Sequence, residues 1–203
     1  MKDFSVETYL IRNHKVVKDP DSVGFDRVEE VQIKCDFDLK DCTCNHFWGM
    51  KRLKRFKVLS KKSRFYTIEG VLFADISPDP NDDMRGKEMF WDLPKGFYGK
   101  VLVAFPTDYP NRKYVVPEGI NAIGKGAFDH TSIEELTLPD SIQYIGLDAF
   151  SCTKNLTVLR LPDNRHIVQI NQQEMGGDNK VSFESNNGLP LSEGVLWLWR
   201  LCW

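Results

Sequence analysis

The sequence lacks the features that mark membrane-spanning and strongly charged proteins. No apolar run approaches the roughly 18 residues needed to span a bilayer. The net charge is only −2 in 203 residues, which points to neither nucleic acid nor a membrane as a partner. Residues 1–7 contain no apolar stretch of the signal-peptide type. We therefore expect either an intracellular protein or one whose leader has been removed, without a membrane span.

The cysteines are odd in number and unevenly placed. The five cysteines are an odd number, whereas a disulfide framework normally shows an even count in a shorter chain, so we expect most of them to be reduced. Cys35, Cys42, Cys44 and His46 place four soft metal ligands within twelve residues. Their spacing does not match the closely spaced cysteine pairs of zinc sites. In an extended segment, however, Cys42, Cys44 and His46 would share one face, which leaves a metal-binding protein as an alternative.

Motifs of nucleophilic and phosphate-binding chemistry are also missing. The serines and the four histidines form no Gly-x-Ser-x-Gly elbow. Residues 124–126, Gly-Lys-Gly, begin like a dinucleotide-binding loop, but Asp129 stands where the third glycine belongs. The sequence therefore predicts a protein that is not an enzyme and has no cofactor.

What the sequence does contain is a repeat. Two segments of twelve residues share the same pattern. Residues 117–128 read Pro-Glu-Gly-Ile-Asn-Ala-Ile-Gly-Lys-Gly-Ala-Phe, and residues 139–150 read Pro-Asp-Ser-Ile-Gln-Tyr-Ile-Gly-Leu-Asp-Ala-Phe. The two segments lie 22 residues apart, and Pro162 follows the second proline after 23. A period in the low twenties is typical of a solenoid, in which each unit must stack on its neighbours to bury its apolar face.

A pattern of spacing indicates further units. Apolar residues at positions 1, 4 and 6 occur in Val28-x-x-Val31-x-Ile33, Leu53-x-x-Phe56-x-Val58, Ile133-x-x-Leu136-x-Leu138 and Leu156-x-x-Leu159-x-Leu161. The last two positions of each copy alternate as in a half-buried strand. Phe47, Phe128 and Phe150 precede three of the copies. We predict units made of a strand, a corner, a second short strand and a short helical turn, with the rings at Phe128 and Phe150 stacked between units.

A different segment, residues 65–116, interrupts the repeats. Residues 70–73 and 101–106 are apolar and indicate two paired strands, separated by a polar stretch rich in turn residues. Residues 183–191 resemble the opening of a second such hairpin. The chain ends in an apolar, tryptophan-rich stretch, residues 195–203. Because open sheet edges favour association, this stretch is a candidate homodimer interface.

These strings resemble the BspA-like leucine-rich repeats. The resemblance is carried by Val116-Pro117-Glu118-Gly119-Ile120-x-x-Ile123-Gly124-x-x-Ala127-Phe128 and by Leu138-Pro139-Asp140-Ser141-Ile142-x-x-Ile145-Gly146-x-x-Ala149-Phe150. It implies a mainly β leucine-rich repeat solenoid with short helical turns and β-hairpin inserts. It also implies an adhesion or binding protein that is secreted or held at the cell surface. Cys152 falls where the family often has a small buried residue.

The expected organisation has three parts. Residues 1–27 carry no repeat and are expected to cap the solenoid. The solenoid itself is expected over residues 28–194, with the hairpin insert at about 65–116 and the best repeats at 117–162. Residues 195–203 are expected to form an apolar C-terminal strand. Since solenoids normally finish in a polar cap, a truncated family member without independent activity is an alternative.

One stretch, residues 51–64, has eight basic side chains and no acidic ones. Apolar residues interrupt it at strand spacing, so the basic side chains should point outward and could meet an acidic partner. Lys57 should lie beside Gln32 or Thr137 at the roughly 4.8 Å spacing of neighbouring strands. Nucleic acid is not predicted, because the accompanying aromatic residues belong to the apolar core pattern.

The solenoid strand face is the predicted binding surface. Solenoids offer extended surfaces rather than closed pockets, which suits a protein or other macromolecular ligand. The outward positions predicted to contact it are Lys54, Lys57, Glu135, Thr137, Thr157 and Arg160.

Overall fold

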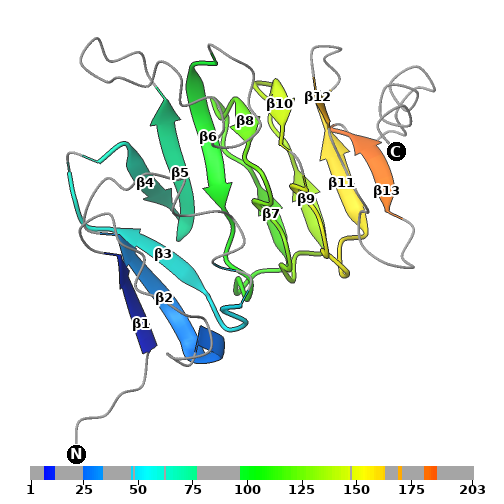
Figure 1. Ribbon diagram of the computed structural model, residues 1–203. Helices are drawn as coiled ribbons and strands as arrows, with labels where there is room; N and C mark the ends of the chain where they lie inside the picture. Colours follow the sequence, from blue (N-terminus) through cyan, green and yellow to red (C-terminus); the bar gives the residue numbers. More distant parts are fainter. Residues whose placement is uncertain are drawn as a thin grey trace, which may run out of the picture.

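The computed structural model describes residues 7–11, 25–33, 47, 49–61, 63–76, 97–146, 148–162, 169–170 and 181–186. Within them the regular secondary structure is almost entirely strand, arranged in three sheets (Figure 1). The predicted C-terminal strand and the cysteine-rich segment with Cys35, Cys42, Cys44 and His46 lie outside these residues. The boundaries expected for the cap and the solenoid remain predictions.

The largest sheet joins the hairpin insert to the short second strands of the repeat units. Its order is β12-β10-β8-β6-β5-β4. The members are β4 (Phe65–Ile68), β5 (Val71–Ile76), β6 (Gly99–Ala104), β8 (Ala122–Ile123), β10 (Tyr144–Ile145) and β12 (Gln169–Ile170). Strands β4, β5 and β6 pair antiparallel, whereas β6, β8, β10 and β12 pair parallel. The predicted pairing of residues 70–73 with 101–106 is confirmed. Strand β6 joins the insert to the repeats, because it pairs with β5 on one side and with β8 on the other.

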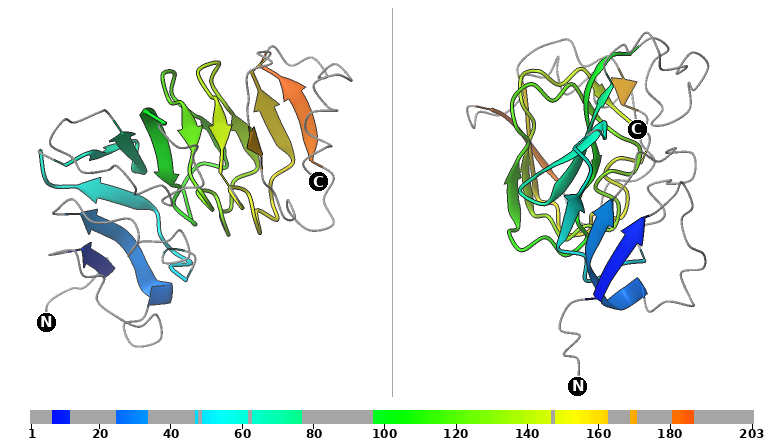
Figure 2. Two further views of the ribbon diagram at one scale, coloured as in Figure 1. Left: turned by 45° about the horizontal axis from the view of Figure 1, so that its top comes forward. Right: turned by 90° about the vertical axis from the view of Figure 1, so that its left-hand side faces the viewer.

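The second sheet carries the first strand of each C-terminal unit. It comprises β7 (Lys113–Val115), β9 (Glu135–Thr137), β11 (Val158–Leu161) and β13 (Ser182–Ser185), in the order β13-β11-β9-β7 and all parallel. Figure 2 shows these units following one another along a single axis. Residues 183–185 therefore continue the solenoid sheet as part of β13. The expectation that residues 183–191 open a second hairpin stays a prediction, because residues 187–191 lie outside the described residues.

The third sheet lies at the N-terminal end of the described chain and runs at an angle to the β7–β13 sheet (Figure 1). It contains β1 (Glu7–Ile11), β2 (Val28–Ile33) and β3 (Arg55–Val58), all parallel, and a short 3-10 turn at Phe25–Arg27 precedes β2. The strands predicted from the spacing at 28–33 and 53–58 are thus present. Lys57 pairs with Gln32 and not with Thr137, because β3 and β9 belong to different sheets.

Stacked phenylalanine rings run through the core of the solenoid. Phe128 and Phe150 stack with centroids 5.5 Å apart and planes 29° apart, as predicted. Phe105 extends the stack, at 4.9 Å and 27° from Phe128. The alanine before each ring lets the backbones approach, so that the Phe105 N–H donates to Ala127 O at 2.7 Å and the Phe128 N–H donates to Ala149 O at 2.8 Å. Each unit is therefore fixed to the next through both side chain and backbone.

The predicted short helical turns take the form of consecutive hydrogen-bonded turns. In the unit of Phe128, the N–H groups of Ala127, Asp129 and Thr131 each donate to a carbonyl three residues earlier, which is the 3-10 spacing. Residues two places before and two places after the ring have positive φ. These residues are Gly126 (58°) and His130 (57°) around Phe128, and Asp148 (54°) and Cys152 (52°) around Phe150. The same left-handed backbone thus recurs at equivalent positions of neighbouring units.

Two apolar cores lie on opposite faces of β5 and β6, where the N-terminal sheet joins the solenoid. One is built around Phe105, Phe128 and Phe150, and the other around Phe56 and Leu53. Backbone hydrogen bonds connect the two parts, from the Asp108 N–H to Leu53 O at 2.8 Å and from the Phe56 N–H to Gly70 O at 2.7 Å. The β4–β5 turn approaches β3 so closely that a Cβ on Gly70 would lie 2.8 Å from the Arg55 Cβ. Only glycine suits this contact, since its φ is +81°.

We predict that Phe128→Ala lowers the free energy of unfolding by about 3–5 kcal/mol, because it removes a fully buried ring that contacts both neighbouring units. Chemical denaturation at equilibrium measures the loss. The control is Tyr98→Ala, since Tyr98 is 60% exposed and its loss should cost less than about 0.5 kcal/mol. Equal, small losses in the two variants would contradict the role given to the ring stack.

Candidate functional site

The outward face of the β7–β13 sheet is a regular array of mostly polar side chains. The strand register places Tyr114, Leu136, Leu159 and Phe183 in one row, and that row faces the core. The residues on either side of it form two outward rows. These are Lys113–Glu135–Val158–Ser182 and Val115–Thr137–Arg160–Glu184. We call these eight residues the strand face.

Ion pairs of alternating sign link all four strands of the strand face. Lys113 Nζ lies 2.5 Å from Glu135 Oε1, and Arg160 Nη1 lies 3.1 Å from Glu135 Oε2. Arg160 Nε reaches the next strand, where Glu184 Oε2 is 3.1 Å away. The side chains of Glu135, Arg160 and Glu184 are only 24%, 29% and 26% exposed. Each of these charged side chains is therefore held in place by ion pairs with its neighbours.

Glu135 is the carboxylate on which this network centres. Hydrogen bonds from Lys113 and then Arg160 lower the pKa of Glu135, against a smaller opposing effect of burial. The ionised form is thus favoured in the folded protein. Arg160 in turn is shared between two carboxylates on opposite sides, an arrangement that the planar, many-donor guanidinium suits better than lysine would.

Two further features lie on or beside the strand face. Val115 is the most exposed large apolar residue there, at 67%, and it is flanked by Thr137 on β9. Thr157 is exposed just before β11, and its hydroxyl donates to Glu134 O at 3.1 Å. The array thus combines charged, hydroxyl and apolar groups on one rigid sheet.

The basic residues near β3 form a separate group. Arg52 and Lys54 both contact Glu29, at 2.8 and 3.1 Å, and Arg55 contacts Glu30 at 2.5 Å. The hydrogen bond from Lys54 lowers the pKa of Glu29 most. Burial raises the pKa of Glu30, but hydrogen bonds from neighbouring side chains outweigh it and leave that pKa lowered. As predicted, the apolar residues of the stretch turn inward and the charged ones outward.

The structure divides the six predicted binding residues between two sheets. Glu135, Thr137 and Arg160 belong to the strand face, and Thr157 lies beside it. Lys57 lies on β3 and the half-buried Lys54 just before it, in the other parallel sheet. The β4–β5 turn contacts β3, through the hydrogen bond that Phe56 donates to Gly70. The six residues therefore do not form one continuous row.

Sequence reasoning missed Lys113, Val115 and Glu184. The signal for β7 was Tyr114-x-Val116-Pro117, which has the spacing of Leu136-x-Leu138-Pro139 in the next unit. The apolar spacing does not predict β7 as a repeat strand, because Asn111 occupies the first position of the pattern, where the other copies have an apolar residue.

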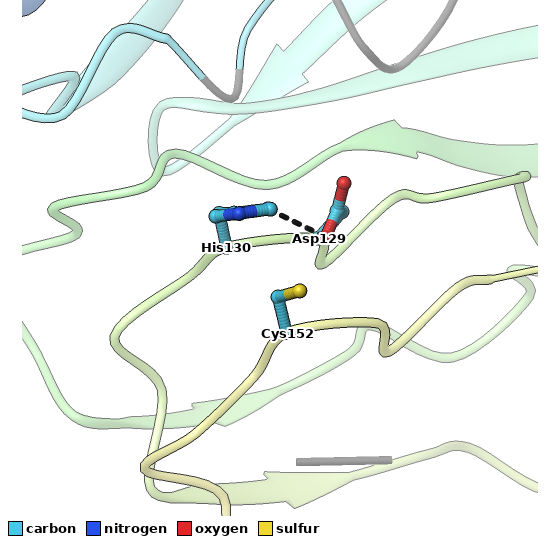
Figure 3. Close-up of side chains that lie close together, drawn as sticks. All are labelled: Asp129, His130 and Cys152. Carbon is cyan, nitrogen blue, oxygen red and sulfur yellow. Dashed lines mark hydrogen bonds and ion pairs between the residues drawn. The ribbon is translucent and has the colours of Figure 1, made fainter. Parts of the chain in front are cut away.

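A second group of side chains with metal-ligand atoms lies at the turns that follow Phe128 and Phe150. Asp129, His130 and Cys152 each place a ligand-type atom within 4.8 Å of the others (Figure 3). Asp129 Oδ1 is 2.7 Å from His130 Nδ1. Burial raises the pKa of Asp129, although the hydrogen bond with His130 partly offsets this. Cys152 is an exposed free thiol, which corrects the expectation of a buried residue.

The pairing of His130 with Cys152 had a signal in the sequence. The two residues lie 22 positions apart, which is the repeat period, and equivalent positions of neighbouring units stack. Both lie two residues after a phenylalanine of the ring stack.

The parallel strands, the stacked rings and the repeated turns define a leucine-rich repeat solenoid. The comparison with protein families identifies the type. Residues 104–184 match the BspA type leucine rich repeat region, with six copies, and this part of the chain is a BspA-type repeat region. A search for relatives among curated proteins found no match.

Three solved structures resemble the chain. A leucine-rich repeat protein from Eubacterium ventriosum is 14% identical with a TM-score of 0.48, over 78% of this chain and 37% of its own. A leucine rich cell surface protein from Faecalibacterium prausnitzii is 15% identical (TM-score 0.35), and the pneumococcal vaccine antigen PcpA is 14% identical (TM-score 0.32). Both alignments cover 68% of this chain and 46% of the other. The chain thus spans less than half the length of each.

Among the described residues, no helix is long and apolar enough to cross a membrane.

We predict that Glu135→Gln destabilises the protein at pH 7 by no more than about 1 kcal/mol, as for a surface ion pair. The folded-state pKa of Glu135 is lowered, so its stabilising effect is present above the unfolded-state pKa and is lost as the pH falls through the folded-state value. Denaturation at pH 7 and pH 3 should therefore show a loss in the variant at pH 7 that shrinks at pH 3.

The control is Glu134→Gln, since Glu134 is exposed and its side chain makes no ion pair within the described residues. An equal loss for Glu135→Gln at both pH values would contradict the account of the network.

Proposed function

We propose that the protein is a non-enzymatic scaffold that binds a protein partner through the strand face. The observation that carries the proposal is the chain of alternating ion pairs across β7, β9, β11 and β13. Side chains held in place before binding lose little conformational entropy when a partner docks, so an ordered polar surface binds more favourably than a mobile one. The sheet beneath adds rigidity, because each strand is fixed to its neighbours.

The pattern of charge specifies the partner further. The ion-pair chain begins at Lys113 and ends at Glu184, and each of these terminal charges has one partner within the strand face. A complementary protein would place an acidic group near Lys113 and a basic group near Glu184. Three strand spacings separate β7 from β13, and Lys113 and Glu184 are offset by two residues along the strands, so the two groups would lie roughly 16 Å apart. An apolar side chain would contact Val115, which lies on the same strand as Lys113.

Thr137 and Thr157 complete this proposed contact surface as hydroxyl donors and acceptors. Lys54 and Lys57 form a separate basic region, which we propose contacts an acidic segment of the same partner. Glu29 and Glu30 neutralise only part of the charge there. Attraction between this region and an acidic segment would speed association at low salt more than it would tighten the final complex.

We further propose, from the BspA-type repeats, that the protein acts at the cell surface or after secretion, with adhesion as its role. A homodimer through residues 195–203 remains an alternative mode of association, and those residues lie outside the described structure.

The test compares three single variants for partner capture. Val115→Asp and Arg160→Ala alter the strand face, while Lys100→Ala removes one exposed positive charge from β6 in the other sheet. Immobilised wild type and variants are exposed to a mixture of extracellular and cell-surface proteins, and retained proteins are quantified by mass spectrometry.

We expect a protein that wild type and Lys100→Ala retain equally and that both strand-face variants retain at least about tenfold less. Retention unchanged by Val115→Asp and Arg160→Ala, or the recovery of no partner at all, would contradict the proposal.

A further inference from the structure

We propose that Asp129, His130 and Cys152 form a binding site for a divalent transition-metal ion, with Zn²⁺ as the best-suited ion. The site is separate from the strand face and does not depend on the proposed binding function. Its three donors are a carboxylate oxygen, an imidazole nitrogen and a sulfur atom, which together make up the ligand types that Zn²⁺ uses in proteins. All three lie within 4.8 Å of one another.

The fold brings the donors together through the stacking of two neighbouring units. Asp129 and His130 follow Phe128, and Cys152 follows Phe150 in the next unit. The two turns are held side by side by the His130 N–H, which donates to Ser151 O at 3.2 Å. The left-handed backbone at both His130 (φ 57°) and Cys152 (φ 52°) gives these two residues the same local geometry. Their side chains therefore meet at equivalent places one repeat apart (Figure 3).

The distances are suited to a tetrahedral ion after a small adjustment. Bonds of about 2.0–2.3 Å from Zn²⁺ place neighbouring ligand atoms about 3.3–3.7 Å apart. The Asp129 Oδ1–His130 Nδ1 separation of 2.7 Å would widen as their hydrogen bond is replaced by two metal bonds. The cysteine would bind as a thiolate and release its proton on metal binding. Three protein ligands leave a fourth position for water or another donor.

A metal at this position would link two consecutive units of the solenoid outside the ring stack. A ligand that binds only the folded state stabilises it in proportion to its occupancy. We therefore expect Zn²⁺ to raise the Tm of the protein, and to do so only while Cys152 is available.

The competing donors are Cys42, Cys44 and His46, which the sequence also places within reach of one another. The experiment must separate the two sets. Co²⁺ serves as the probe, since a bound cobalt–thiolate pair absorbs in the near ultraviolet by charge transfer and thus reports cysteine ligation directly. Titrations compare the full chain with Cys152→Ser and with the double variant Cys42→Ser/Cys44→Ser.

We expect the charge-transfer band in the wild type and in Cys42→Ser/Cys44→Ser, saturating at one Co²⁺ per chain and abolished by added Zn²⁺. It should be absent in Cys152→Ser. His130→Ala and Asp129→Ala should each weaken binding by more than about 100-fold, because the loss of a direct ligand exceeds the tenfold to 100-fold cost of losing an outer partner.

A band that survives in Cys152→Ser, that disappears in Cys42→Ser/Cys44→Ser, or that is missing from the wild type would overturn the proposal. So would wild-type affinity in His130→Ala. Circular dichroism of each metal-free variant checks its fold. A second measurement needs no variant: Zn²⁺ should slow the alkylation of Cys152 in the wild-type chain, followed by peptide mass spectrometry, and an unchanged rate would equally overturn the site.

Discussion

The structure depends on the stacking of equivalent buried side chains from one unit to the next. No single unit of about 22 residues encloses a core, so the units stack, and Phe128 is buried between the rings of Phe105 and Phe150. The backbone bonds beside the rings, from Phe105 to Ala127 and from Phe128 to Ala149, fix the distance between units. This distance is set in the core. It therefore also sets the spacing of the four strands that carry the strand face and of the turns that follow Phe128 and Phe150.

Both proposed sites are consequences of this regular spacing. On the strand face, neighbouring strands lie close enough for Glu135 to bind both Lys113 and Arg160, so that a network forms from residues more than twenty positions apart. At the turns, the same spacing between neighbouring units places Cys152 beside His130. The two sites differ in what they suit. The strand face is wide and polar, as a protein partner requires, whereas the turn cluster is compact and chemically mixed, as a metal ion requires.

Much of the fold could be predicted from the sequence, because repetition makes a weak local signal visible several times. The strands around Val31, Phe56, Leu136 and Leu159 share one spacing and all are present. The strand at Tyr114 was missed because Asn111 breaks that spacing, and β13 because Ser185 occupies an inward position. The ion-pair network was not predicted, although Glu135 and Arg160 were expected on the outward face. Lys113 and Glu184, which lie directly opposite Glu135 and Arg160, were missed because β7 and β13 were not recognised as repeat strands. The turn cluster was missed because the 22-residue separation of His130 and Cys152 places them at equivalent turns but does not give the direction of their side chains.

The central claim is that stacking between units, rather than the stability of any single unit, holds the solenoid and its surfaces in place. A double-mutant cycle on Phe128 and Phe150 tests it most directly, with each ring replaced by leucine singly and together and the free energy of unfolding measured for all four proteins. The account predicts a coupling energy of about 0.5–1.5 kcal/mol between the two rings, as for other aromatic pairs in contact. Effects that simply add, within about 0.3 kcal/mol, would show that the rings stabilise their own units independently and would contradict the claim.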